Sequence, residues 1–72
     1  MNELDYYTAF RERARLARAY GHACDRSRLA LNRFNQDRTP ENRRALMDAI
    51  EDCDRKHAAL DEHETMMRAI PA

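Results

Sequence analysis

Glycine, proline and tryptophan are nearly missing from this sequence. Its 72 residues include one glycine, two prolines and no tryptophan. A β-sheet protein of this length needs several tight turns, which glycine and proline usually supply. Alanine, leucine, arginine, glutamate and methionine are frequent instead, and all are strong helix formers. The composition therefore predicts an all-α protein.

Cysteine is also scarce, and long apolar runs are missing. Two cysteines allow at most one bridge, which does not make a secreted disulfide scaffold. The first residues contain no basic segment followed by an apolar stretch, and no run of about eighteen apolar residues occurs, so we expect neither a signal peptide nor a membrane span. We therefore expect a cytoplasmic protein in which Cys24 and Cys53 are thiols.

The charges cancel overall but are unevenly divided. Thirteen basic residues balance thirteen acidic ones. Residues 1–38 contain eight arginines and five acids, whereas residues 39–72 contain five basic residues and eight acids. This complementarity favours packing of the two halves side by side. It also argues against a general nucleic-acid binder, whose domain would be basic as a whole.

One strong interruption divides the chain. Asn35 is suited to the left-handed conformation that ends a helix, Thr39 is a good N-cap, and Pro40 suits the first helical position. We therefore predict a turn over residues 36–39.

The outer helix ends also have signals. Asn2, with Asp5 three residues later, resembles an N-terminal cap, and Pro71 closes the second helix. The predicted helices are 3–35 and 40–69.

A seven-residue repeat of mainly apolar and small residues follows both helices and predicts a coiled-coil-like contact line. In the second helix it comprises Leu46, Ile50, Cys53, His57, Leu60, Glu64 and Met67. In the first helix it comprises Phe10, Ala17, Cys24 and Leu31.

The two lines also match each other in register. Facing residues in an antiparallel hairpin have numbers with a constant sum, and a sum of 77 fits repeatedly. The predicted pairs are Phe10 with Met67, Arg13 with Glu64, Ala17 with Leu60, Tyr20 with His57, Cys24 with Cys53, Ser27 with Ile50, and Leu31 with Leu46.

Further apolar residues remain outside this contact line. They are Tyr6, Leu16, Ala23, Ala30, Met47, Met66 and Ile70. Two helices cannot enclose them, so we expect residues 1–72 to form one helical-hairpin domain that pairs with a second copy as a four-helix bundle.

Catalytic and metal-binding motifs find little support. There is no glycine-rich phosphate loop, and no acid–base partner is placed beside Ser27. Asp54, His57, Asp61 and Glu64 share a helix face, which leaves a metal-binding bundle as one alternative. Cys24 and Cys53 could join His57, but no fourth ligand is evident. We predict no enzyme activity, no cofactor and no metal.

Protein binding uses most of the remaining features, because tyrosine, methionine and arginine are enriched at interfaces. The predicted partner-binding residues are Tyr20, Arg33, Phe34, Arg38, Arg43, Arg44, Asp48, Glu51 and Asp52. A nucleic-acid-binding helical dimer is the alternative. Its phosphate contacts would come from the arginines that ring the first helix, although neighbouring acids can neutralise much of that charge.

The segment Arg38-Thr-Pro-Glu-Asn-Arg43 between two helices, together with the small size, resembles very small helical proteins of bacteriophages. In particular, the chain resembles the phage quorum-sensing anti-activators, which are dimers of helical hairpins. This resemblance implies a non-enzymatic inhibitor in the host cytoplasm. It would block the DNA-binding region of a LuxR-type transcriptional activator and, as a second target, a type IV pilus assembly ATPase. The resemblance assigns no role to an individual residue.

Overall fold

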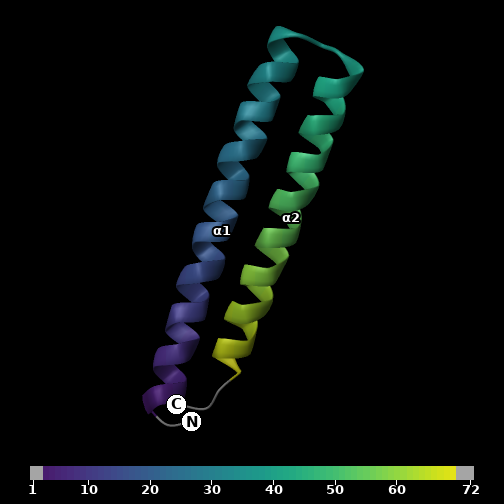
Figure 1. The fold of residues 1–72 in the computed structure, drawn as a ribbon. Helices are drawn as coiled ribbons and strands as arrows, with labels where there is room; N and C mark the ends of the chain where they lie inside the picture. The colour runs from purple at the N-terminus through teal and green to yellow at the C-terminus, as the bar shows by residue number, and fades with distance from the viewer. Residues whose placement is uncertain (1–2, 70–72) are drawn as a thin grey trace.

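Two long antiparallel helices form the structure, a computed structural model that describes residues 3–69 (Figure 1). Helix α1 spans Glu3–Gln36 and helix α2 spans Pro40–Arg68. The prediction of an all-α hairpin is confirmed, and α1 ends one residue later than expected while α2 ends one residue earlier. The capping roles predicted for Asn2 and Pro71 lie outside the described residues, as does Ile70.

The start of α2 is built as its sequence predicts. Thr39 has extended backbone angles (φ −88°, ψ 158°), and its side-chain oxygen accepts a hydrogen bond from the Asn42 backbone N–H at 3.1 Å. Pro40 occupies the first turn, where its missing N–H is not needed. This cap fixes the point at which the chain reverses.

The end of α1 differs from the prediction that Asn35 adopts a left-handed conformation. The helix continues through Gln36, and no non-glycine residue among those described has a positive φ. The Asp37 N–H donates to the Arg33 carbonyl at 2.9 Å, and the Asn42 side-chain amide donates to the Asp37 carbonyl at 2.8 Å. Because these bonds satisfy groups at the helix end, no left-handed residue is required.

The hairpin is one helix thick. Its extents are 53 × 16 × 12 Å and its radius of gyration is 16.4 Å, whereas a compact domain of 72 residues has a radius of about 11 Å. Ala23 is the only fully buried residue in the part of the chain that is described. The two helices therefore share a line of contact and do not enclose a core.

Ala23 and half-buried side chains, mostly at alternating steps of three and four, define that contact line. In α1 they include Ala9, Leu16, Tyr20, Ala23, Ser27, Ala30 and Phe34. In α2 they include Asn42, Leu46, Ala49, Cys53, Lys56, Leu60, His63 and Met67. The heptad spacing of a coiled coil is therefore present in both helices.

The predicted contact line of α1 is displaced by one residue. Leu16, Ala23 and Ala30, which were expected outside it, lie at the helix–helix contact, while Ala17 and Leu31 are exposed. Alanine allows two helix backbones to approach closely, and a bulky side chain at the same place would hold them apart. Phe10, which lies seven residues before Ala17, is also off the contact line and is 54% exposed.

A similar correction applies to α2. Ile50 is 41% exposed and His57 is also exposed, and their neighbours Ala49 and Lys56 are half-buried instead. Two adjacent positions in a helix can each repeat every seven residues, although their side chains point about 100° apart around the axis. The repeat alone therefore does not decide which of the two positions faces the other helix. The five remaining predicted positions of α2, Leu46, Cys53, Leu60, Glu64 and Met67, are half-buried.

The predicted register is confirmed at three levels of the hairpin. The pairs in contact are Cys24 with Cys53 (Sγ–Sγ 3.4 Å), Arg13 with Glu64 (Nη2–Oε1 3.1 Å) and Tyr20 with His57 (ring centroids 5.2 Å apart). All three pairs lie toward the same side of the contact line. The sequence repeat through Phe10, Ala17, Cys24 and Leu31 had placed the centre of the helix–helix interface on that side.

Replacing Ala23 with leucine is expected to destabilise the hairpin. The added side chain must enter the closest approach of the two helices, so we expect the free energy of unfolding to fall by about 1–3 kcal/mol. Urea titration followed by circular dichroism measures this change. The matched control is Ala58→Leu on the exposed surface of α2, which should leave stability nearly unchanged. Equal effects of the two substitutions would contradict the assigned contact line.

Candidate functional site

One side of the contact line is an open apolar face. Phe10 and Leu31 lie at seven-residue steps from Cys24, and Ile50 is three residues before Cys53, so all three share the side of the cysteine contact. Tyr7 lies one turn from Phe10 and is also exposed. We define the open apolar face as Tyr6, Tyr7, Phe10, Leu31 and Ile50, with Tyr6 and Phe10 in ring contact at 5.4 Å between centroids.

Gly21 lies on this face, one turn before Cys24. A Cβ atom added at Gly21 would meet nothing within 4 Å. Glycine inside a helix is less favourable than alanine by about 1 kcal/mol, because it loses more backbone freedom on folding. Nothing within the single hairpin requires glycine at this position.

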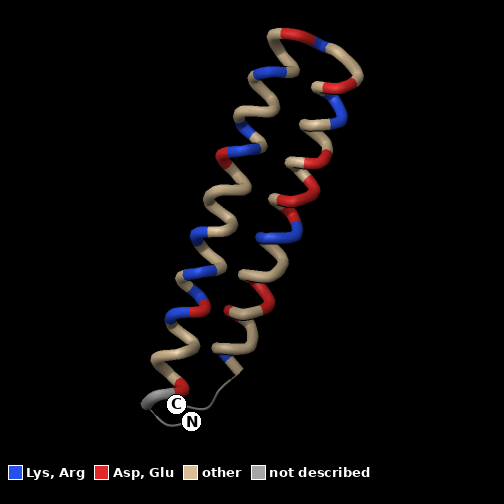
Figure 2. The backbone as a smooth tube through the Cα atoms, viewed as in Figure 1, with Lys and Arg blue, Asp and Glu red and all other residues tan. Residues whose placement is uncertain are grey.

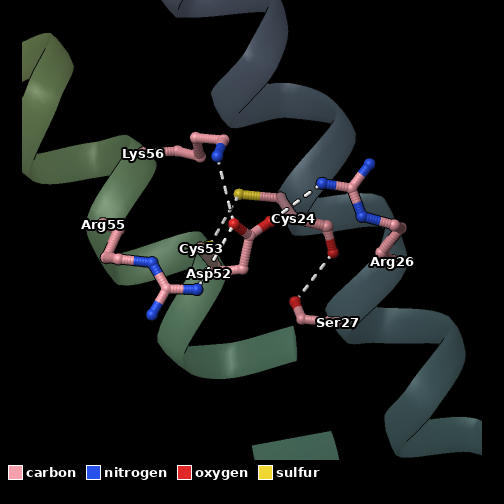
Figure 3. Close-up of polar contacts among 7 residues, drawn as sticks. All are labelled: Cys24, Arg26, Ser27, Asp52, Cys53, Arg55 and Lys56. Atoms are coloured by element: carbon pink, nitrogen blue, oxygen red, sulfur yellow. Dashed lines mark hydrogen bonds and ion pairs between the residues drawn. The ribbon is translucent and has the colours of Figure 1, made fainter. Parts of the chain in front are cut away.

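The other side of the contact line is occupied by an ion-pair cluster centred on Asp52 (Figure 3). Asp52 is two residues beyond Ile50, or about 200° around α2. Its carboxylate accepts hydrogen bonds from Arg26 at 2.9 Å and Lys56 at 3.1 Å, and Arg55 lies 3.7 Å away. The bond from Arg26, followed by the bond from Lys56, lowers the pKa of Asp52 below its ordinary value. One side of the hairpin thus holds the ion-pair cluster, and the other holds the exposed apolar residues together with the Arg13–Glu64 ion pair.

The uneven charge distribution produces contacts between the helices. Basic residues prevail along α1 and acidic residues along α2 (Figure 2). Ion pairs of Arg13 with Glu64 and of Arg26 with Asp52 join the two helices. The complementarity seen in the sequence therefore contributes directly to the pairing of the helices.

The two cysteines meet at the middle of the hairpin (Figure 3). Both are free thiols, and their sulfur atoms are 3.4 Å apart. The hydrogen bond with Cys24 is the main reason that the pKa of the Cys53 thiol lies above its ordinary value. Partial burial and the negative charges of Asp54 and Asp52 raise it further.

A tip pocket lies where the chain turns from α1 into α2. Its volume is about 700 Å³, and it is lined by Phe34, Arg38, Thr39, Pro40, Arg43, Arg44, Met47 and Asp48. The Arg38 guanidinium lies over the Phe34 ring at 5.6 Å from the centroid. Arg43 and Arg44 form no ion pair with any described residue. The pocket thus combines an aromatic wall with unneutralised guanidinium groups.

The structure gathers five of the nine predicted partner-binding residues in this pocket, namely Phe34, Arg38, Arg43, Arg44 and Asp48. The other four lie elsewhere. Arg33 lines a separate hollow beside Ala45, and Glu51 is exposed on α2. Tyr20 lies at the contact line and Asp52 lies in the ion-pair cluster.

The histidines occupy different positions from those expected. His63, rather than His57, lies at the contact line, where its Nε2 donates to the Ala9 carbonyl at 3.1 Å. Across residues 3–69, no three histidine, cysteine or acidic side chains are placed to hold a metal ion. Within the same range, neither helix is both long and apolar enough to cross a bilayer.

Sequence reasoning missed three participants in these sites. Lys56 binds Asp52, a contact that the four-residue spacing between them could have indicated. Met47 lines the tip pocket, although it was expected only as part of the apolar remainder. Gly21 was not singled out, because no local signal marks it as lying opposite open space.

Comparison with protein-family models, curated proteins and solved structures finds no match to this chain.

Oxidation is expected to join Cys24 and Cys53 within one chain, because their sulfur atoms need only a small shift to reach the bonding distance of about 2.05 Å. We expect glutathione disulfide to remove both thiols, as measured by a thiol reagent and by mass. The rate should rise with pH as more of the Cys53 thiol, whose pKa is raised, becomes the reactive thiolate. Cys53→Ser should instead trap a mixed disulfide with glutathione. Predominant bridges between chains would contradict the intrachain contact.

Proposed function

We propose that this chain is a non-enzymatic protein-binding protein that acts as a homodimer and modulates its partner by covering part of the partner's surface. The observation that supports this most strongly is the open apolar face on a hairpin that has no enclosed core. Large apolar side chains gathered on one face of a soluble domain usually mark a surface that another protein covers.

The exposed area supports a second copy as the covering partner. The chain exposes 5967 Å², whereas a compact monomer of 8.5 kDa exposes about 4,700 Å². The excess of about 1,300 Å² is larger than the roughly 800 Å² that each partner contributes to a standard interface. Two copies packed through this face give a four-helix bundle in which each hairpin supplies half of a core.

Gly21 supports close packing at that face. A helix that lacks a side chain in the middle of an apolar surface allows another helix to approach its backbone. The stability lost by placing glycine within α1 is then offset by contacts across the dimer. The ion-pair cluster around Asp52 stays on the outer side of each hairpin, where its charges remain near water.

Dimerisation through the open apolar face leaves the tips and outer surfaces available for a different protein. The resemblance to phage anti-activators names the DNA-binding region of a LuxR-type activator as the first partner to test, with a type IV pilus assembly ATPase as the second. Inhibition by occupying a surface needs no catalytic group, and its specificity would come from shape and charge.

Ile50→Glu is expected to dissociate the dimer, because it buries a carboxylate in the apolar interface without a partner. Light scattering coupled to size-exclusion chromatography measures the change in mass. The matched control is Leu29→Glu, because Leu29 is 56% exposed but lies off the open apolar face. A wild-type protein that remains monomeric at tens of micromolar would overturn the dimer, and dissociation by the control alone would relocate the interface.

Gly21→Ala gives an independent reading of the same face. If the face is covered, the added methyl group should weaken the dimer. The variant would then dissociate at a protein concentration at which the wild type is still dimeric. If the face is open to water, the substitution should instead raise the free energy of unfolding by about 1 kcal/mol, because alanine is the better helix former. Stabilisation without any change in association would count against the proposed interface.

The modulating role is tested directly with a purified LuxR-type activator bound to labelled operator DNA. Addition of the dimer is expected to release the DNA in proportion to its concentration. Ile50→Glu, which separates the subunits, serves as the comparison. Unchanged DNA binding in the presence of excess folded dimer would exclude this activator as the partner.

A further inference from the structure

The tip pocket contains three arginines, Arg38, Arg43 and Arg44, and a single acid, Asp48. None of those three arginines has an ion-pair partner within the described residues. Six other arginines lie within 4.0 Å of carboxylates, namely Arg13, Arg15, Arg26, Arg28, Arg55 and Arg68. The remaining three, Arg11, Arg18 and Arg33, are exposed elsewhere on α1. The pocket therefore brings together three guanidinium groups that no carboxylate of the described residues contacts.

The pocket also has an apolar component. Phe34 is half-buried between the helices, and Pro40 and Met47 complete a wall that water solvates poorly. The position of Arg38 over the Phe34 ring restrains that guanidinium near the wall through a cation–π contact. A ligand suited to this site presents an apolar side chain together with negative charge.

Arginine sets the chemistry of the negative group. The planar guanidinium matches a carboxylate through two parallel hydrogen bonds. Arg43 and Arg44 are adjacent in the first turns of α2, where the aligned peptide dipoles also favour negative charge. Carboxylates spaced along a peptide could therefore meet both arginines while an intervening apolar residue contacts Phe34.

The surroundings favour a protein over a nucleic acid. A volume of about 700 Å³ accommodates a few side chains. Binding along a phosphate backbone requires an extended basic surface, but Asp48 lies at the pocket and Glu51 continues the surface of α2 beyond it with negative charge. A compact acidic segment that ends at the arginines does not extend along α2 toward Glu51.

From these observations we infer that the tip pocket docks an acidic segment of a partner protein, with carboxylates on Arg43 and Arg44 and an apolar side chain against Phe34. This inference depends on the proposed protein-binding function and specifies the chemistry of the partner. It places the partner site at the turn, at the end of the hairpin next to Leu31 and Ile50 of the open apolar face.

The test uses fluorescence anisotropy with a short labelled peptide that alternates glutamate with leucine and phenylalanine. We expect the full-length protein to bind it, with affinity falling as salt rises. The double variant Arg43→Glu/Arg44→Glu should bind about tenfold more weakly or worse, because favourable ion pairs become repulsive. The matched control is Arg11→Glu/Arg18→Glu, which makes the same charge change on exposed α1 residues and should bind like the wild type.

Two further probes complete the experiment. The same peptide with glutamine in place of glutamate should bind much more weakly, and a duplex DNA oligonucleotide should not compete. Equal loss in both double variants, equal binding of the neutral peptide, or stronger binding of the DNA would each overturn the inference. Circular dichroism of every variant ensures that lost binding does not reflect lost helix.

The outcome can be separated from that of the proposed function. Light scattering on the same preparations reports the dimer, and the operator-release assay reports the modulating role. If the tip double variant still releases DNA as the wild type does, the docking site is wrong while the function stands. If the wild type binds the acidic peptide but is monomeric and releases no DNA, the proposed function fails while the tip site stands.

Discussion

The close approach of two helices along a line of small side chains determines the remaining features of this molecule. Ala23 is enclosed there, and Ala9, Ala30 and Ala49 keep the helices near each other above and below it. Because these residues are small, they bring the backbones together but remove little apolar area from water. Some larger side chains, among them Phe10, Leu31 and Ile50, lie at the edge of the contact and stay exposed, so the two sides of the hairpin differ in character.

The ion-pair cluster and the exposed apolar residues lie at different edges of the contact. Asp52 and its three basic neighbours bridge one edge, and the hydrogen bonds from Arg26 and Lys56 lower the pKa of the carboxylate. Phe10, Leu31 and Ile50 lie along the other edge with nothing above them. In a two-fold dimer, each copy covers the exposed apolar edge of the other with the same residues. The edge is then buried without a different protein, which is why the proposed assembly is two-fold.

Much of the fold follows from the sequence because its signals are local or periodic. Thr39 and Pro40 mark the start of α2, and the constant sum of facing residue numbers identifies Cys24 opposite Cys53. The choice of contact face could not be obtained in this way. Residues 23 and 24 belong to equally regular repeats, and only the packed pair of helices reveals that the smaller residue is enclosed.

The tip pocket was partly predictable for a related reason. Aromatic and basic residues cluster in the sequence near the turn, so Arg33, Phe34, Arg38, Arg43 and Arg44 were expected to act together, and all of them except Arg33 line the pocket. Which arginines lack a carboxylate depends on side-chain positions across the hairpin, and these are not contained in local spacing. Asp52 illustrates the same point, because its neighbours in space include Arg26 from the opposite helix.

A protein only 12 Å thick, with one enclosed residue in its described part, places few demands on its outer positions. Substitutions on the outward surfaces alter charge and shape while the line of alanines continues to hold the helices together. Recognition of a partner and maintenance of the hairpin therefore draw on largely separate sets of residues. Such a scaffold can acquire a new target through changes at its tip without first having to rebuild its interior.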